Sequence, residues 1–317
     1  AGLALLLAAG PAAAEGVGER YPDRPIRLII PWAPGGSTDS IGRALAARMT
    51  ETLGQPVVVD NRPGASAQLG ADLIAKAPTD GYTLGIIELP HVIAPALIRK
   101  IPFDVLRDFA PITRIGSAPM VFYTGTGPDA PTDFAGFMAL TKQGRPVAIG
   151  LSGNGSVGHL TTGALASREK LDFNNVPYKG AAPALTDLAA GTVVATVATQ
   201  ASGSALLAAN KIRALAVTSE QRVASLPDVP TFRELGYPYL VLGQWWGLVA
   251  PATTPVPILE KARASALEAI GNAEVRQKLA AIGVHLEGSS RDELRAYMRS
   301  EHERWGAVAR DIGLRPE

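Results

Sequence analysis

The chain has 317 residues, of which 47% are apolar and 6% aromatic, and its formal net charge is +1. This length and composition indicate one large or two modest α/β domains with a buried core, and they exclude a disordered chain. The balanced charge argues against nucleic-acid binding, and the lack of cysteine in the sequence excludes disulfides and thiolate metal sites.

The first residues are typical of an export signal. Residues 3–9 form a short apolar run, Ala12-Ala13-Ala14 suits cleavage, and the sequence becomes polar from Glu15. The run is far shorter than the roughly 20 apolar residues that span a membrane. We therefore expect residues 1–14 to be the remainder of a secretory signal peptide that is removed near Ala14, which leaves a periplasmic monomer.

The chain then alternates strand-like and helix-like segments. Residues 26–31 predict a strand buried on both faces, and apolar residues at helical spacing follow over residues 41–53. Further strands are expected at residues 57–59 and 82–87, with a short helix at residues 69–75 between them. This βαβαβ order predicts a parallel sheet whose ligand lies at the carboxyl ends of the strands.

The same order repeats in the second part of the chain. We expect strands at 147–151, 193–199 and 212–218 and helices at 134–141, about 158–167, 182–190 and 204–209. A strand at 241–249 can return to the first domain, and helices at 256–270, 275–282 and about 291–312 are expected to pack there. The predicted boundaries are residues 21–122 with 244–317 for domain 1 and residues 123–243 for domain 2.

Two glycine-rich turns stand where a strand meets a helix. The first is Pro34-Gly35-Gly36, followed by Ser37 or Thr38 as the N-cap, and the second runs from Ser152 to His159. Glycine lets the backbone approach a ligand, and the N-terminus of a helix attracts anions. Two such turns that face each other would form a cleft for a small carboxylate.

Four side chains near these turns have competing interpretations. Trp32 can stack on a ligand or fill the turn, and we favour ligand contact. Glu88 is a solvated rim charge, a contact for a cationic or hydroxyl group of the ligand, or a partner of His91. His159 contacts the ligand or caps its helix. Asp39 is expected to complement the helix dipole rather than touch the ligand.

An alternative function is a nucleotide-dependent α/β oxidoreductase. Gly153-x-Gly155-x-x-Gly158 matches the dinucleotide fingerprint, but the acidic residue expected after the next strand is missing. In the first unit Asp60 ends the second strand, but the spaced glycines are missing. Neither unit carries both halves of the signature, so we expect no cofactor.

At these residues the chain resembles the Bug family, the extracytoplasmic receptors of tripartite tricarboxylate transporters. The resemblance extends from Tyr21 to about Gly313 and is carried by many short blocks in one order. They include Tyr21-Pro22, Pro34 to Asp39, Gly54 to Val59, Asn61 to Ala65, Asp80 to Leu84, Asp108 to Pro111, Ser152 to Ser156, Gly158 to Leu160, Val176 to Gly180, Leu215 to Thr218 and Leu226 to Thr231.

The resemblance implies a type II periplasmic binding protein fold, with two α/β lobes joined by crossing strands and a ligand cleft between them. It also implies a carboxylate ligand, membrane transporter subunits as partners, and no enzymatic activity or metal. The expected ligand-binding residues are Trp32, Pro34, Gly35, Gly36, Ser37, Thr38, Gly64, Ala65, Glu88, Ser152, Asn154, Gly155, Ser156, His159, Tyr178, Gly180, Ala181 and Gln200.

The chain departs from the family pattern at two places that line the expected pocket. Glu88 to His91 replace small polar residues, and Ala195, Val197, Ala198 and Gln200 stand where acidic and amide residues are usual. A more apolar wall beside Trp32 would suit an aromatic or longer acid. A receptor that serves a sensor instead of a transporter is a further alternative.

Overall fold

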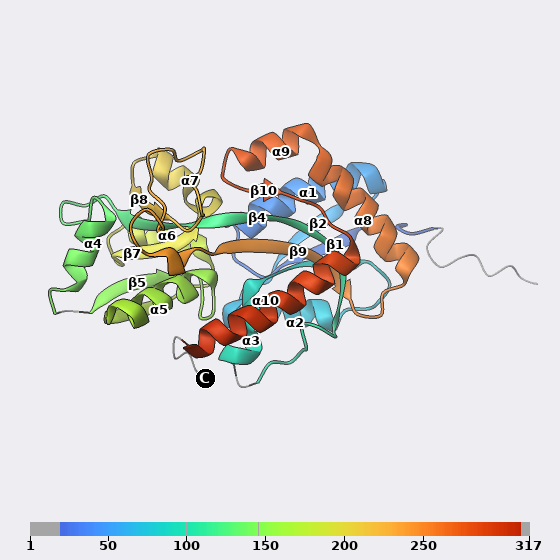
Figure 1. Ribbon diagram of the computed structural model, residues 1–317. Coiled ribbons are helices and arrows are strands. Elements are labelled where there is room, and N and C mark those ends of the chain that lie inside the picture. The colour runs from blue at the N-terminus through green and yellow to red at the C-terminus, as the bar shows by residue number, and fades with distance from the viewer. Residues whose placement is uncertain (1–19, 99, 145, 312–317) are drawn as a thin grey trace, which may run out of the picture.

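Two sheets share one long strand in the computed structural model, which describes residues 20–98, 100–144 and 146–311 (Figure 1). The shared strand is β4 (Phe109–Gly125), and β9 (Gly243–Pro251) runs beside it between the two lobes. The fold is α/β, with two lobes joined by these crossing strands. The expected signal peptide at residues 1–14 lies outside the described residues.

The first lobe is built on a sheet with the order β2-β1-β3-β9-β4-β10. The predicted parallel pairing is confirmed, because β1 pairs in parallel with both β2 and β3. Its strands and helices are β1 (Ile26–Ile30), α1 (Ser37–Leu53), β2 (Val57–Asn61), η1 (Ala65–Ala67), α2 (Gln68–Ala75), β3 (Thr83–Glu88), α3 (Leu89–Leu97) and β10 (His285–Leu286).

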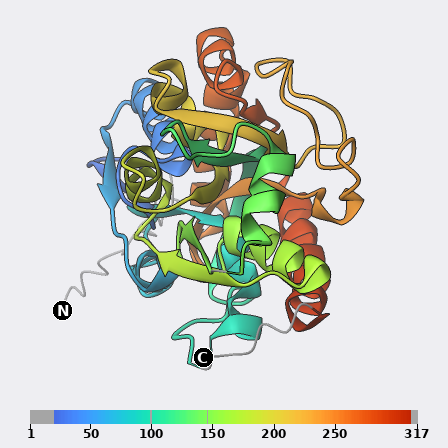
Figure 2. The same ribbon diagram turned by 90° about the vertical axis from the view of Figure 1, so that its left-hand side faces the viewer.

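The second lobe repeats this arrangement. Its strand β5 pairs in parallel with β6 and β7, and β4 lies between β7 and β8 in antiparallel pairing. Figure 2 looks at this lobe, where helices surround the strands. Its elements are α4 (Phe134–Thr141), β5 (Val147–Leu151), α5 (Val157–Glu169), β6 (Phe173–Pro177), α6 (Ala181–Ala189), β7 (Ala195–Thr199), α7 (Gln200–Ala208), β8 (Ile212–Val217) and η2 (Pro238–Leu240).

Three C-terminal helices cover the first lobe: α8 (Val256–Gly271), α9 (Ala273–Ala280) and α10 (Arg291–Asp311). As expected, α8 packs on α1, and α10 packs on α3. Ile258 and Leu259 of α8 join Ile41 and Leu45 of α1 in one apolar core. The expected domain boundaries stay a prediction, because β4 belongs to both sheets.

The structure differs from the expectations at three local points. Residues 89–97, for which no element was expected, form the helix α3, and residues 109–125 form the single long strand β4. The strand β4 accommodates Pro111 and Gly116 at register shifts against β9. The N-cap of α1 is Gly36 instead of Ser37 or Thr38.

Candidate functional site

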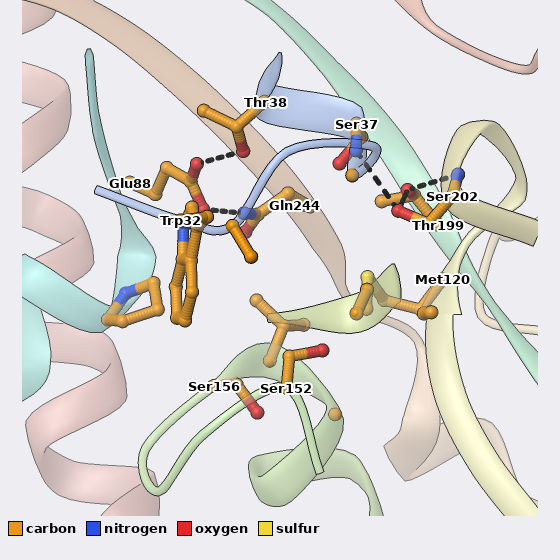
Figure 3. Close-up of a pocket in the computed structure, with 17 residues that line it drawn as sticks. Trp32, Ser37, Thr38, Glu88, Met120, Ser152, Ser156, Thr199, Ser202 and Gln244 are labelled. Carbon is orange, nitrogen blue, oxygen red and sulfur yellow. Dashed lines mark hydrogen bonds between the residues drawn. The ribbon is translucent and has the colours of Figure 1, made fainter. Parts of the chain in front are cut away.

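A cavity lies between the lobes at the carboxyl ends of β1, β3, β5 and β7 (Figure 3). The cavity has a volume of about 50 Å³. Sites for drug-sized ligands are much larger, at roughly 300–1,000 Å³. It is lined by Trp32, Ala33, Gly36, Ser37, Thr38, Glu88, Pro90, Met120, Ser152, Ser156, Val157, Gly158, Ala181, Ala198, Thr199, Ser202 and Gln244.

The first glycine turn is held by Asp39. The Asp39 carboxylate accepts hydrogen bonds from the Gly35 amide (3.1 Å), the Asn61 side chain (3.0 Å) and Arg43 (3.0 Å). Burial works to raise the pKa of Asp39, but these hydrogen bonds hold it below its usual value. The expected structural role of Asp39 is confirmed, since its side chain fixes the turn and does not line the cavity.

Two amides of the second turn find acceptors within the turn itself. The Ser156 hydroxyl accepts a hydrogen bond from the His159 amide (3.2 Å) and is the N-cap of α5. The His159 ring accepts one from the Gly155 amide (3.0 Å). Of the two interpretations of His159, the structure therefore supports the role at the helix start, and His159 is not among the residues that line the cavity.

The two lobes touch directly around the cavity. The Ala33 amide donates to the Lys179 carbonyl (3.2 Å), and the Ser37 amide donates to the Ser202 hydroxyl (3.1 Å), as Figure 3 shows for the second contact. Gly180 has a φ of +140°, and a Cβ there would lie 3.5 Å from the Ala33 nitrogen. Glycine is needed at this position because of its conformation, since a Cβ would make only an ordinary contact with the opposite turn.

Glu88 is buried at the cavity wall and is not a solvated rim charge, since its exposed fraction is 1%. Its two carboxylate oxygens accept hydrogen bonds from the Thr38 hydroxyl and the Gln244 amide nitrogen (Figure 3). Burial raises the pKa of Glu88 to about 7, although hydrogen bonds from Thr38, Trp32, Gln244 and Trp246 favour the ionised form. The site thus contains a carboxylate poised near neutral pH.

His91 supports the start of α3 and lies outside the cavity. Its Nδ1 accepts a hydrogen bond from the Glu88 backbone amide (2.9 Å), so the expected partnership of these residues runs through the backbone instead of through an ion pair. The ring is fully buried, and burial lowers the pKa of His91 to about 4. The imidazole is therefore neutral.

The structure brings part of the predicted set together. Eight of the expected residues line the cavity: Trp32, Gly36, Ser37, Thr38, Glu88, Ser152, Ser156 and Ala181. The others do not line it: Pro34, Gly35, Gly64, Ala65, Asn154, Gly155, His159, Tyr178, Gly180 and Gln200.

Two of these predicted residues bond elsewhere. The Tyr178 hydroxyl donates to Asp187 (2.6 Å), and the Gln200 side chain accepts from the Ser225 hydroxyl (2.6 Å). Trp245 and Trp246 of β9 are both buried, and neither lines the cavity. Instead Trp246 donates to the Thr38 hydroxyl (3.1 Å) and so acts behind the cavity wall.

Sequence reasoning missed the contributions of β4, α7 and β9. Met120 comes from the middle of β4, and Gln244 comes from β9. Thr199 and Ser202 come from the start of α7, where the Thr199 hydroxyl is the N-cap. A Thr-x-x-Ser pattern directly after a strand was the available signal for this third helix start.

The dinucleotide fingerprint has a structural explanation. A Cβ on Gly153 would lie 3.3 Å from the Ser66 hydroxyl of the other lobe, and one on Gly158 would lie 2.5 Å from the Val197 carbonyl. These glycines allow close packing of the turn, and the small cavity leaves no room for a dinucleotide. Among the described residues, none group as a metal site, and none of the described helices is long and apolar enough to cross a membrane.

The comparisons with known proteins agree with this geometry. The family model of the tripartite tricarboxylate transporter family receptor matches residues 41–314. Protein BugT of Bordetella pertussis (strain Tohama I) is 35% identical, over 99% of this chain and 97% of that protein.

Two solved structures are similar over nearly the whole chain. The periplasmic binding protein BugD has a TM-score of 0.90 at 29% identity, with 94% of this chain and 100% of that chain covered. The R. palustris protein Rpa4515, solved with adipate, has a TM-score of 0.90 at 33% identity with the same coverage. The chain therefore belongs to the Bug family of tripartite tricarboxylate transporter receptors, which are periplasmic solute-binding proteins and not enzymes.

Proposed function

We propose that this chain binds a small organic carboxylate between its lobes and delivers it to the membrane subunits of a tripartite tricarboxylate-type transporter. The observation that carries the proposal is the convergence of helix starts from both lobes on one cavity. The first turns of α1 and α5 border it, and the start of α7 adds two hydroxyl groups. Amides in the first turn of a helix have no partner within that helix, so they can bind an anion.

The size of the cavity favours a compact acid. An aromatic or longer acid was expected from the apolar residues Ala195, Val197 and Ala198, but the first two belong to the apolar core and only Ala198 lines the cavity. Adipate, the acid bound by the similar protein Rpa4515, is itself an open aliphatic chain. We therefore propose an aliphatic ligand, and the experiment below also includes aromatic acids.

Thermal unfolding against a panel of acids tests the binding step. Aliphatic dicarboxylates, amino acids and benzoate-type acids are each added to the protein from Glu15 onward. A ligand at 100 times its dissociation constant should add about 2.7 kcal/mol to the free energy of unfolding. Stabilisation by aromatic acids alone would overturn the proposed ligand class. No stabilisation by any acid would overturn the binding function.

Export and delivery need separate measurements. We propose that residues 1–14 are removed during export, so the N-terminus of the protein recovered from the periplasm should lie near Glu15. Cells that carry this chain should take up the bound acid faster than cells that lack it. Equal uptake would argue against delivery and would favour a receptor that serves a sensor.

A further inference from the structure

Glu88 and Gln244 form a pair of hydrogen-bond acceptors in the cavity wall. Both side chains are more than nine-tenths buried, and both line the cavity. The Gln244 amide nitrogen donates to one Glu88 oxygen. This leaves the Gln244 carbonyl oxygen buried and without a hydrogen-bond partner among the described residues. A buried polar group that lacks a hydrogen-bond partner costs about 1–3 kcal/mol of free energy. A ligand that donates a hydrogen bond to this oxygen would remove that cost.

The directions of the neighbouring hydrogen bonds favour a charged Glu88. The Trp246 ring nitrogen can only donate, so the Thr38 oxygen that it contacts (3.1 Å) is an acceptor there. The Thr38 hydrogen is then directed to the other Glu88 oxygen. Both carboxylate oxygens therefore accept hydrogen bonds from the protein. An ionised carboxylate also fixes the orientation of the Gln244 amide, with its NH₂ group toward Glu88.

This carboxylate has no cation beside it in the cavity. Glu88 is the one charged residue among the described residues that line the cavity, and Arg43, near the first turn, is bonded to Asp39 and Asn61 instead. Buried charges in proteins are normally paired with an opposite charge. A plain dicarboxylate would place further negative charge in the same small cavity, whereas a ligand with a cationic group would supply the missing partner.

The rest of the cavity wall has the opposite character. Its hydroxyl groups belong to Ser37, Ser152, Ser156, Thr199 and Ser202, and the first-turn amides of α1 and α5 lie among them. Hydroxyls and helix N-termini suit a carboxylate. The cavity thus combines an acceptor pair with a group of donors within a small volume.

We propose that the ligand is a compact zwitterion, whose ammonium group contacts Glu88 and Gln244 and whose carboxylate contacts the helix starts. This inference rests on the proposed function and narrows its ligand class to amino-acid-like molecules. It also differs from the aromatic or longer acid that was expected from the sequence, because Glu88 favours an amino-acid ligand. Glu88 then selects between acids that differ only at the nitrogen.

Matched acids test the proposal on the wild-type protein by isothermal titration. Each pair exchanges an ammonium group for a methyl group of similar size: alanine with 2-methylpropanoate, 4-aminobutanoate with pentanoate, and aspartate with methylsuccinate. In at least one pair the amino member should bind about 10- to 100-fold more tightly, which is the effect of a hydrogen bond to a charged group. Equal or tighter binding of the methyl members in every pair would overturn the proposal.

Two variants test whether Glu88 and Gln244 produce the preference for the amino member of each pair. Glu88→Gln keeps the shape but removes the charge, and Gln244→Met removes the unpartnered oxygen at similar volume. Each should reduce the preference for the amino member over the methyl member by about tenfold or more. Glu301→Gln is the matched control, since Glu301 is another buried glutamate, bonded to Trp305 (3.0 Å) and outside the cavity. An unchanged preference in both cavity variants would overturn the roles of Glu88 and Gln244.

The outcomes separate this inference from the proposed function. If no acid of any pair and no dicarboxylate binds, the carboxylate-receptor function itself fails. If dicarboxylates or methyl members bind best, the receptor function stands and the zwitterion is wrong. Malate is included beside aspartate because it replaces the ammonium group with a hydroxyl, and equal binding of the two would contradict the need for a cation.

Discussion

The two glycine turns follow the same plan but differ in what completes them. The second turn is self-contained, because Ser156 caps α5 and the His159 ring accepts from Gly155. The first turn has Gly36 at its N-cap with no side-chain cap, and the Ser37 amide bonds across the cleft to Ser202. In both turns a side chain of the following helix accepts from a glycine amide, but only the first turn also uses an acceptor from the opposite lobe.

The side chains and backbone that surround the two turns also differ. Thr38, directly after the first turn, hydrogen-bonds to the buried carboxylate of Glu88. Behind the second turn, Gly158 packs closely on the backbone of β7. The second turn is thus held by close backbone packing, whereas the first turn contacts a buried ionisable group. Similar local sequence does not imply a similar contribution to stability.

The largest expected effect is on how the free energy of unfolding depends on pH, because Glu88 lies against the first turn. Its pKa rises from 4.5 to about 7 in the folded protein, and since a tenfold change in an equilibrium is about 1.4 kcal/mol, the rise corresponds to about 3 kcal/mol. A raised carboxyl pKa contributes stability below the unfolded value, and this contribution is lost as pH rises through the folded value. Without ligand, the wild type should therefore lose stability relative to Glu88→Gln as pH rises from about 4.5 to about 7, and the difference should level off above pH 7.

Urea unfolding of both proteins at several pH values measures this difference. The neutral His91 acts in the opposite direction, because its lowered pKa removes stability as pH falls from 6.5 through about 4. That contribution is common to both proteins and cancels when their stabilities are subtracted. A difference that does not change with pH would show that Glu88 keeps its ordinary pKa.

The packing of the second turn predicts the next largest effect. In Gly158→Ala the new Cβ would meet the Val197 carbonyl at 2.5 Å, which should cost about 1–3 kcal/mol as an overpacked contact. The matched change in the first turn, Gly36→Ala, places the Cβ 4.0 Å from the Ala33 carbonyl and should cost less, about 0.5–1 kcal/mol for a poorer N-cap. Urea midpoints that fall equally in both variants would remove this contrast between the turns.

Capping predicts a smaller contrast. Ser156→Ala should destabilise the protein by about 1 kcal/mol, because the His159 amide loses its acceptor. Ser37→Ala should cost less than about 0.5 kcal/mol, because α1 has no side-chain cap to lose. Thermal unfolding without ligand checks both variants. A larger loss in Ser37→Ala would mean that its hydroxyl stabilises the first turn after all.

The smallest effect concerns the loop that meets the second turn from the other lobe. Ala65, Ser66 and Ala67 all have positive φ, at 46°, 53° and 75°. Ala65 is exposed, so Ala65→Gly should relieve left-handed strain without loss of buried surface and stabilise the protein by about 0.5 kcal/mol. Ala209→Gly is the control, since Ala209 is exposed with a φ of −81° and should lose stability. Equal losses in both variants would contradict strain at Ala65.

The alternation of strands and helices could be read from the sequence where a strand is an apolar run that ends in a glycine turn, as β1 and β5 are. Local pattern identified Phe134–Thr141 and Val147–Leu151 at their observed bounds. The helix α3 was missed because Pro90 and Pro95 resemble loop residues, although proline is tolerated in the first turn of a helix. The length of β4 was missed because its prolines and glycines interrupt the apolar pattern.

The candidate site was predictable where residues directly follow a strand, as at Ser37 and Ser152. Met120 and Gln244 lie within long strands, and only the crossing of β4 and β9 brings them to the cavity. Gln200 was chosen in place of Ser202, which is two positions further along α7. Neighbouring positions on a helix face different directions, and the orientation depends on the N-cap at Thr199.

The position of β9 between β3 and β4 has a consequence for the order of folding. These two strands are close in sequence but do not pair directly, because residues 243–251 lie between them in the sheet. Contacts between distant segments form slowly, since the intervening chain must first be closed into a loop. The first sheet therefore stays incomplete until the last quarter of the chain has been synthesised, and a nascent chain that ends before Gly243 exposes two unpaired strand edges.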